Sequence, residues 1–112
     1  MQEPLQALLI AGEKQQIEVL NGSKTCSIRM GFRNYKIEKP ILIGCHLRQW
    51  CILTEVTFVK HLLLKDLTIE MLDNEGYYNL SDAINNLSKY YPTVNENSEI
   101  TYLEWKVKWN QY

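Results

Sequence analysis

The strictest alternation of apolar and polar residues lies near the carboxyl end of the chain. Leu103, Trp105, Val107 and Trp109 occupy every second position there. The residues that alternate with them are Tyr102, Glu104, Lys106 and Lys108. A period of two is typical of a strand that turns one face toward a core. We therefore predict a strand whose first set of four side chains points inward and whose second set lies on the other face.

Three earlier segments also have the composition of strands. Residues 25–30 are short and partly β-branched, and residues 41–45 form a continuous apolar run. Residues 50–63 form a longer run that is rich in β-branched side chains, as strands usually are. The face of this run that we expect to be buried carries Ile52, Val56 and Phe58.

Two helices are indicated in the second half of the chain by residues that can cap them. Asp66 is expected to cap a helix that runs to about Leu72, and Asn79 to cap a second one. The second helix carries one apolar stripe, which consists of Leu80, Ala83, Ile84 and Leu87. Pro92 follows it, where a residue that cannot continue a helix is common.

A shorter helix is predicted near the amino end, over residues 13–20. Its apolar positions, Ile17 and Leu20, have the three-residue spacing of a helix face directed at a core. Asn21 and Gly22 follow directly, and both residue types tolerate the left-handed conformation that often ends a helix.

Composition places the chain among ordinary soluble globular proteins. Of its 112 residues, 46% are hydrophobic and 22% are charged, which suits a single domain over residues 1–112. No apolar run approaches the roughly 20 residues that cross a bilayer, and the start Met-Gln-Glu-Pro does not resemble a signal peptide. Three cysteines without close pairing argue against a disulfide framework. We expect a reduced, cytoplasmic protein, and no cofactor is indicated.

Charge is unevenly distributed along the chain although the net charge is only −1. Residues 24–48 hold six basic side chains against one acid, whereas residues 66–99 hold seven acids against one base. This asymmetry predicts either a basic face and an acidic face, or two surfaces that neutralise each other where they meet.

The greatest concentration of reactive groups is the run Gly-Ser-Lys-Thr-Cys-Ser-Ile-Arg at residues 22–29. It follows a predicted helix end and opens a predicted strand, and loops held by rigid elements often carry binding groups. The alternative is an ordinary turn followed by the solvent face of a strand.

This run resembles the signature of the ASCH domain, which has the pattern Gly-x-Lys-x-x-Glu-x-Arg. Gly22, Lys24 and Arg29 match it, while Ser27 stands where most members have Glu. Small single-domain N4-acetylcytidine amidohydrolases of this group have Thr at that position. The resemblance implies an α+β fold, a small PUA-like β-barrel of mainly antiparallel strands with about three short helices. One departure is Glu-Lys-Pro at residues 38–40, where members usually have Gly-Asp, so the local turn must differ.

Lys24 and Ser27 form the candidate catalytic pair. A serine hydroxyl becomes a good nucleophile when a base accepts its proton, and a lysine can do so if burial or nearby cations such as Arg29 and Arg33 lower its pKa. Residues three apart on an ideal strand point to opposite faces, so Lys24 would have to lie on the turn. The resemblance adds Glu75, which would complete the site by receiving a proton or orienting the cytosine amine. The alternative for Glu75 is a solvated loop acid.

The loop after the signature mixes aromatic and basic side chains, namely Phe32, Arg33, Tyr35 and Lys36. Aromatic faces with cations between them stack unpaired bases and hold phosphates. Together with Arg29, this loop is the candidate surface for RNA or a nucleoside. Alternatively, one of its two aromatic rings packs beneath the domain.

A metal site is not expected. Cys26, Cys45, Cys51, His46 and His61 lack the close spacings of known zinc sites.

The sequence thus leaves several functions open. The first is hydrolysis of the amide of an N4-acylated cytidine through Lys24, Ser27 and Glu75. The second is non-catalytic binding of RNA or nucleotides. A ribonuclease activity is less favoured, because no histidine lies in the signature to act as acid or base. The last is a protein-interaction or inhibitor role through the acidic segment 66–99.

Overall fold

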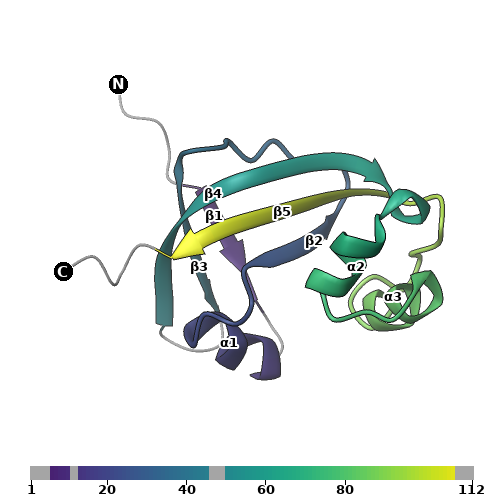
Figure 1. The fold of residues 1–112 in the computed structure, drawn as a ribbon, viewed down its shortest axis with the longest axis horizontal. Coiled ribbons are helices and arrows are strands. Elements are labelled where there is room, and N and C mark those ends of the chain that lie inside the picture. Colours follow the sequence, from purple (N-terminus) through teal and green to yellow (C-terminus); the bar gives the residue numbers. More distant parts are fainter. Residues whose placement is uncertain (1–5, 11–12, 46–49, 108–112) are drawn as a thin grey trace. The chain divides into compact units, whose positions relative to one another are not determined.

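The computed structural model describes residues 6–10, 13–45 and 50–107, apart from the side chains of residues 13, 45, 50 and 51. In that part of the chain five strands form one sheet in the order β1-β3-β4-β5-β2 (Figure 1). The elements are β1 (Gln6–Leu9), α1 (Glu13–Leu20), β2 (Cys26–Met30), β3 (Pro40–Cys45), β4 (Trp50–Leu63), a short 3-10 helix (Leu64–Asp66), α2 (Ile69–Asn74), α3 (Leu80–Leu87) and β5 (Glu99–Val107). The predicted strands and the three short helices are therefore confirmed. No helix among these residues is long and apolar enough to cross a membrane.

The chain divides into two compact units. The first unit comprises residues 1–25, 35–59 and 103–112, and the second comprises residues 26–34 and 60–102. Each unit has its own hydrophobic core. The first contains β1, α1 and β3, and the second contains β2, α2 and α3, while β4 and β5 each contribute residues to both.

In the first unit, β3 lies between two partners. It pairs in parallel with β1, with Leu8 opposite Ile43, and antiparallel with β4, with Ile41 opposite Thr54. Thr54 is fully buried, and its hydroxyl donates a hydrogen bond of 3.1 Å to the carbonyl of Ile41. Because the buried hydroxyl has an acceptor, its desolvation is largely offset. Strand β1 was not predicted.

The buried face of α1 differs from the prediction. Ile17 and Leu20 are 58% and 45% exposed, whereas Val19 is fully buried and Gln16 is nearly so. The amide of Gln16 donates to the carbonyl of Ile10 at 3.2 Å. A polar side chain can lie on the buried face of a helix when its polar group has a hydrogen-bond partner, as the amide of Gln16 has here.

The entry into β3 is formed by residues 38–40. Glu38 has a φ of 62°, in the left-handed region. Its backbone N–H donates to the carbonyl of Val56 at 2.8 Å, and Val56 in turn donates to Lys39 at 3.2 Å. Pro40 is the first residue of β3, a position where the missing N–H of proline is tolerated.

In the second unit, α3 agrees with its predicted cap and stripe. The side chain of Asn79 accepts a hydrogen bond from the N–H of Asp82 at 2.9 Å, and Ala83 and Leu87 are buried. The predicted start of α2 was wrong. Asp66 ends the 3-10 helix, and α2 begins after Thr68, whose hydroxyl accepts from the N–H of Met71 at 3.1 Å.

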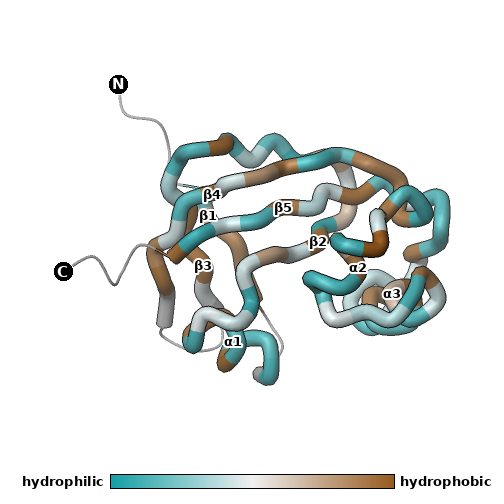
Figure 2. The backbone as a smooth tube through the Cα atoms, viewed as in Figure 1, coloured by the Kyte–Doolittle hydropathy of each residue, from teal (hydrophilic) through white to brown (hydrophobic). Residues whose placement is uncertain are grey.

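Strand β5 shows both the success and the limit of the alternating pattern. Figure 2 shows the repeated change between hydrophobic and hydrophilic residues along it. Leu103 and Trp105 are buried and Val107 is half-buried, as predicted, while Trp109 lies outside the described residues. Tyr102 is also fully buried, contrary to the pattern, because it belongs to the core of the second unit and Leu103 to that of the first.

Strand β4 has a comparable exception. Ile52 and Val56 are buried as predicted, but Phe58 is partly exposed to solvent.

Candidate functional site

The signature begins at the predicted corner between α1 and β2. Gly22 has a φ of 84°, which glycine adopts without strain and which ends the helix. The corner is held by backbone bonds, among them one of 3.0 Å from the N–H of Lys24 to the carbonyl of Glu18. The side chain of Ser23 also binds this carbonyl, at 3.3 Å. Lys24 thus lies on the turn, in the first unit. Thr25 ends this segment of the first unit, and the second unit begins at Cys26.

Strand β2 carries the rest of the signature into the second unit. Cys26, Ser27 and Ile28 are all buried, and Ser27 is 4% exposed. Cys26 and Ile28 belong to the second unit's core. Because successive side chains of a strand point to opposite faces, Ser27 and the half-buried Arg29 lie on the other face of β2.

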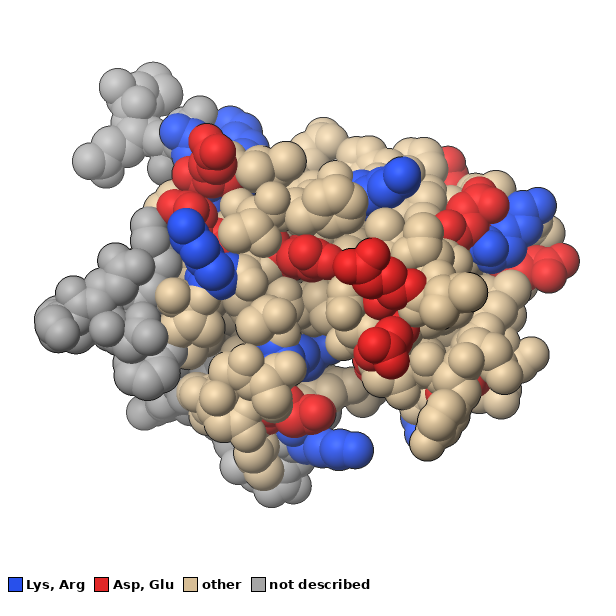
Figure 3. Space-filling view, in the orientation of Figure 1, with Lys and Arg blue, Asp and Glu red and all other residues tan. Residues whose placement is uncertain are grey.

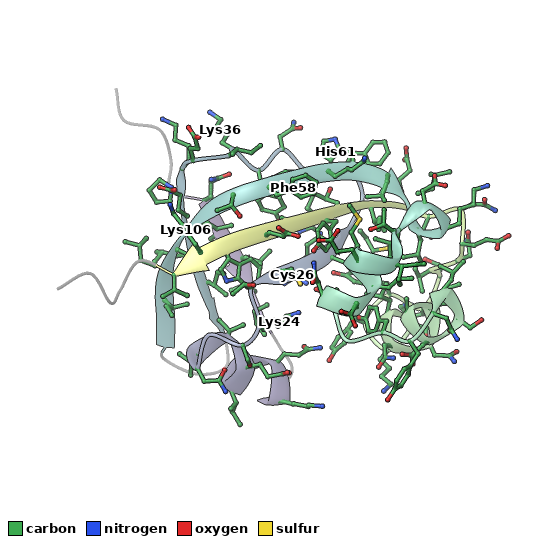
Figure 4. The ribbon with its side chains drawn as sticks, viewed as in Figure 1. Lys24, Cys26, Lys36, Phe58, His61 and Lys106 are labelled. Atoms are coloured by element: carbon green, nitrogen blue, oxygen red, sulfur yellow. The ribbon has the colours of Figure 1, made fainter. Side chains whose placement is uncertain are left out.

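Glu75 lies beside the signature strand, although 49 residues separate it from Cys26. It follows the last residue of α2, and Gly76 then turns the chain with a φ of 79°. Figure 4 labels Cys26 on β2. Its thiol lies 3.3 Å from Glu75 Oε1 and 3.3 Å from the carbonyl of Asn74. The side chain of β2 that contacts this carboxylate is therefore the thiol.

Two residues close to Glu75 in the chain, Asn74 and Tyr77, have notable surroundings in the second unit. The amide of Asn74 donates to the phenol oxygen of the buried Tyr102 at 3.2 Å. Burial raises the pKa of Tyr77 well above its ordinary value, and the nearby carboxylates of Glu75 and Asp82 raise it further. Tyr77 therefore stays a neutral phenol at physiological pH. Sequence reasoning did not assign Asn74, Tyr77 or Tyr102 to the site, because no local motif links them to the signature.

The loop after β2 is anchored to β5 by one buried hydroxyl. Thr101 donates from Oγ1 to the carbonyl of Gly31 at 2.6 Å and accepts from the N–H of Arg33 at 2.7 Å. The N–H of Gly31 binds the carbonyl of Glu99 at 2.7 Å. Gly31 has a φ of 81°, in the left-handed region, which glycine adopts without strain.

An aromatic ring of the loop stacks on a ring from β4. Phe32 is 49% exposed and stacks on the ring of His61 in β4, with centroids 5.0 Å apart and an angle of 13° between the planes. His61 Nε2 lies 2.7 Å from the carbonyl of Arg33, which accepts the hydrogen bond. Arg33 is exposed, and its Nε donates to the carbonyl of Met30 at 3.0 Å. The partnership of His61 with Phe32 was not anticipated, because it depends on contact between distant segments.

The other two residues predicted for this surface belong to the first unit. Tyr35 is half-buried and packs on that unit's core, so the alternative placement of one aromatic ring is correct. Lys36 is exposed, and its backbone is bound on both sides by the side chain of Gln6. Of the four loop residues, Phe32, Arg33 and Lys36 are therefore exposed to solvent, whereas Tyr35 is half-buried.

Charges of both signs occur side by side on the face shown in Figure 3. In the first unit, Lys106 forms an ion pair of 3.2 Å with Glu55. Among the residues that the structure describes, no group of three or more His, Cys, Asp or Glu side chains could hold a metal ion. His46 and the side chains of Cys45 and Cys51 lie outside the described part.

Comparison with solved structures identifies the fold. No protein-family model matches the sequence, and no curated protein is similar to it. An ASCH domain from Lactobacillus crispatus aligns with 92% of this chain and 79% of its own, with a TM-score of 0.66 and 13% identity. A protein from Enterococcus faecalis, described by the family model DUF984, aligns with 96% of this chain and 82% of its own, with a TM-score of 0.67 and 12% identity. The chain therefore has the small α+β, PUA-like fold of ASCH-domain structures.

Proposed function

We propose that this protein binds RNA or a modified nucleoside through the signature strand and the loop that follows it. The observation that carries the proposal is the loop of residues 31–33, which holds a half-exposed aromatic ring and a guanidinium beside β2 within one unit. The ASCH fold is associated with RNA binding, and the cations of the signature, Lys24 and Arg29, match that use.

The chemistry of these side chains suits an unpaired nucleotide. An exposed ring offers a flat face to a base, and each basic side chain that contacts a phosphate releases a bound counterion. The loop is also fixed in advance by the bonds of Thr101, so that little conformational freedom is lost when a ligand binds.

Binding is tested by titrating the protein into labelled single-stranded RNA at several salt concentrations. We expect Lys24→Ala and Arg33→Ala each to weaken binding and to lower the slope of log K against log salt by about one phosphate contact. Lys89→Ala, which removes an exposed cation from the acidic segment, is the control and leaves the slope unchanged. If the wild-type protein binds neither RNA nor nucleosides at low salt, the proposal is wrong. The acidic segment 66–99 would then be the first surface to test for a protein partner.

A second candidate function is hydrolysis of an N4-acylated cytidine. It is favoured by Lys24, which lies on the turn before β2 as a pairing with Ser27 requires. Glu75, in contrast, contacts Cys26, whose side chain points to the face of β2 opposite Ser27. In this reaction Lys24 takes the proton of Ser27, and Ser27 Oγ attacks the amide carbonyl. The nitrogen of cytosine leaves as an amine with the proton that Lys24 had accepted, and water then releases the acyl group from Ser27 as a carboxylic acid.

Incubation with N4-acetylcytidine, followed by chromatography of released cytidine, tests this reaction. Ser27→Ala is expected to abolish turnover but to leave substrate affinity nearly unchanged, since its contribution arises in the transition state. Ser23→Ala is the matched control, because Ser23 is exposed and belongs to the corner rather than to β2. Full activity of Ser27→Ala would remove Ser27 from the mechanism.

A further inference from the structure

We infer that the stacked pair of Phe32 and His61 is a binding position for an unpaired base, separate from the signature strand, and that the ligand is therefore single-stranded RNA rather than a free nucleoside. The inference rests on the proposed function and adds to it the class of ligand and a second contact point.

The pair is built as a rigid platform. One face of Phe32 lies against His61, and half of its surface remains open to solvent. His61 is also held by the bond between its Nε2 and the carbonyl of Arg33. An additional ring placed on the open face of Phe32 would continue an existing stack, and base–aromatic stacking accepts any base because each has a π face.

The loop carries Phe32 away from β2. In the sheet, β5 lies between β2 and β4. Gly31 bonds to Glu99 and the N–H of Arg33 bonds to Thr101, both on β5. The carbonyl of Arg33 and the ring of Phe32 meet the side chain of His61 from β4. Neighbouring strands are about 4.8 Å apart, so β4 and β2 are separated by roughly 10 Å.

This separation decides the class of ligand. A base stacked on Phe32, whose other face lies against the His61 side chain of β4, does not at the same time meet Ser27 or Arg29, because these residues lie on β2, on the far side of β5 from β4. A ligand that uses both positions must carry at least two bases joined by phosphate. Arg33 stands exposed next to the ring and supplies a positive charge for that phosphate. A single-stranded oligonucleotide meets all three requirements.

The test uses a fluorescein-labelled single-stranded RNA of about ten nucleotides in an anisotropy titration. Phe32→Ala is expected to reduce affinity by about tenfold or more without changing the salt slope, because the lost contact is uncharged. Phe32→Trp should retain wild-type affinity, and His61→Ala should cause a smaller loss. Tyr78→Ala is the matched control, because Tyr78 is 94% exposed in the same unit and no role is assigned to it.

A parallel titration with N4-acetylcytidine separates the two positions. Phe32→Ala should lower the affinity for this nucleoside much less than the affinity for RNA, and an equal loss for nucleoside and RNA would overturn the inference. If RNA binds but Phe32→Ala binds it as tightly as the wild type, the inference fails while the proposed function stands. If the wild type binds no RNA, both fail.

Discussion

Replacement of Thr101 by Val tests the link between the sheet and the binding loop. The two side chains have nearly the same shape, and Val is well suited to a strand. Thr101 is fully buried, and its hydroxyl joins the carbonyl of Gly31 at 2.6 Å to the N–H of Arg33 at 2.7 Å. The substitution therefore removes two hydrogen bonds and leaves two backbone groups without this partner.

The cost can be worked from these contacts. Each bond contributes about 1 kcal/mol net, and a buried group left unpaired costs about 1–3 kcal/mol. Because Gly31 is only half-buried and Arg33 is exposed, water can replace some of the loss. We expect the free energy of unfolding to fall by roughly 2 kcal/mol. Urea unfolding measures this value, and RNA affinity should fall with it because the loop that holds Phe32 is loosened.

Thr54→Val is the matched control for this experiment. Thr54 is equally buried in the first unit, but its hydroxyl makes a single bond, to the carbonyl of Ile41. We expect a loss of about 1 kcal/mol and no change in RNA binding. Thr101→Val with the stability of the wild type, or a loss no greater than that of Thr54→Val, would show that the bridging hydroxyl does not hold the loop.

Two further predictions concern buried aromatic side chains. Trp105→Ala should lower the free energy of unfolding by roughly 3–5 kcal/mol in a urea titration, because it opens a cavity in the first unit's core, and a smaller loss than Ile52→Val would contradict that placement. Tyr77 has a raised pKa in the folded state, so it keeps its proton at a pH where the unfolded chain loses one. Stability should therefore be complete below about pH 10 and decline as pH rises further, and unfolding of Tyr77→Phe should lack this part of the decline.

Elements with local signals were predictable from the sequence. The start of α3 depends on the bond between Asn79 and Asp82, three residues apart, and the inward positions of Leu103 and Trp105 follow from the pleat of one strand. The signature corner was likewise predictable, since Gly22 supplies a conformation that few other residues adopt.

The errors occurred where burial depends on distant segments. Tyr102 is buried because it packs in the core of the second unit, and no alternation within the strand can indicate this. Strand β1 has only four residues and forms by parallel pairing with β3, which leaves almost no local pattern. For the candidate site, Glu75 was placed near β2 by resemblance alone, and its contact with Cys26 depends on how α2 ends.

The burial of Cys26 has a consequence for measuring motion in the second unit. Its thiol is 2% exposed and donates its proton toward Glu75 and the carbonyl of Asn74. Alkylating reagents attack a thiolate that they can reach, so this sulfur reacts only when β2 and the end of α2 separate. The rate of its alkylation therefore reports how often this part of the protein opens, and a ligand seated on the signature strand would slow it.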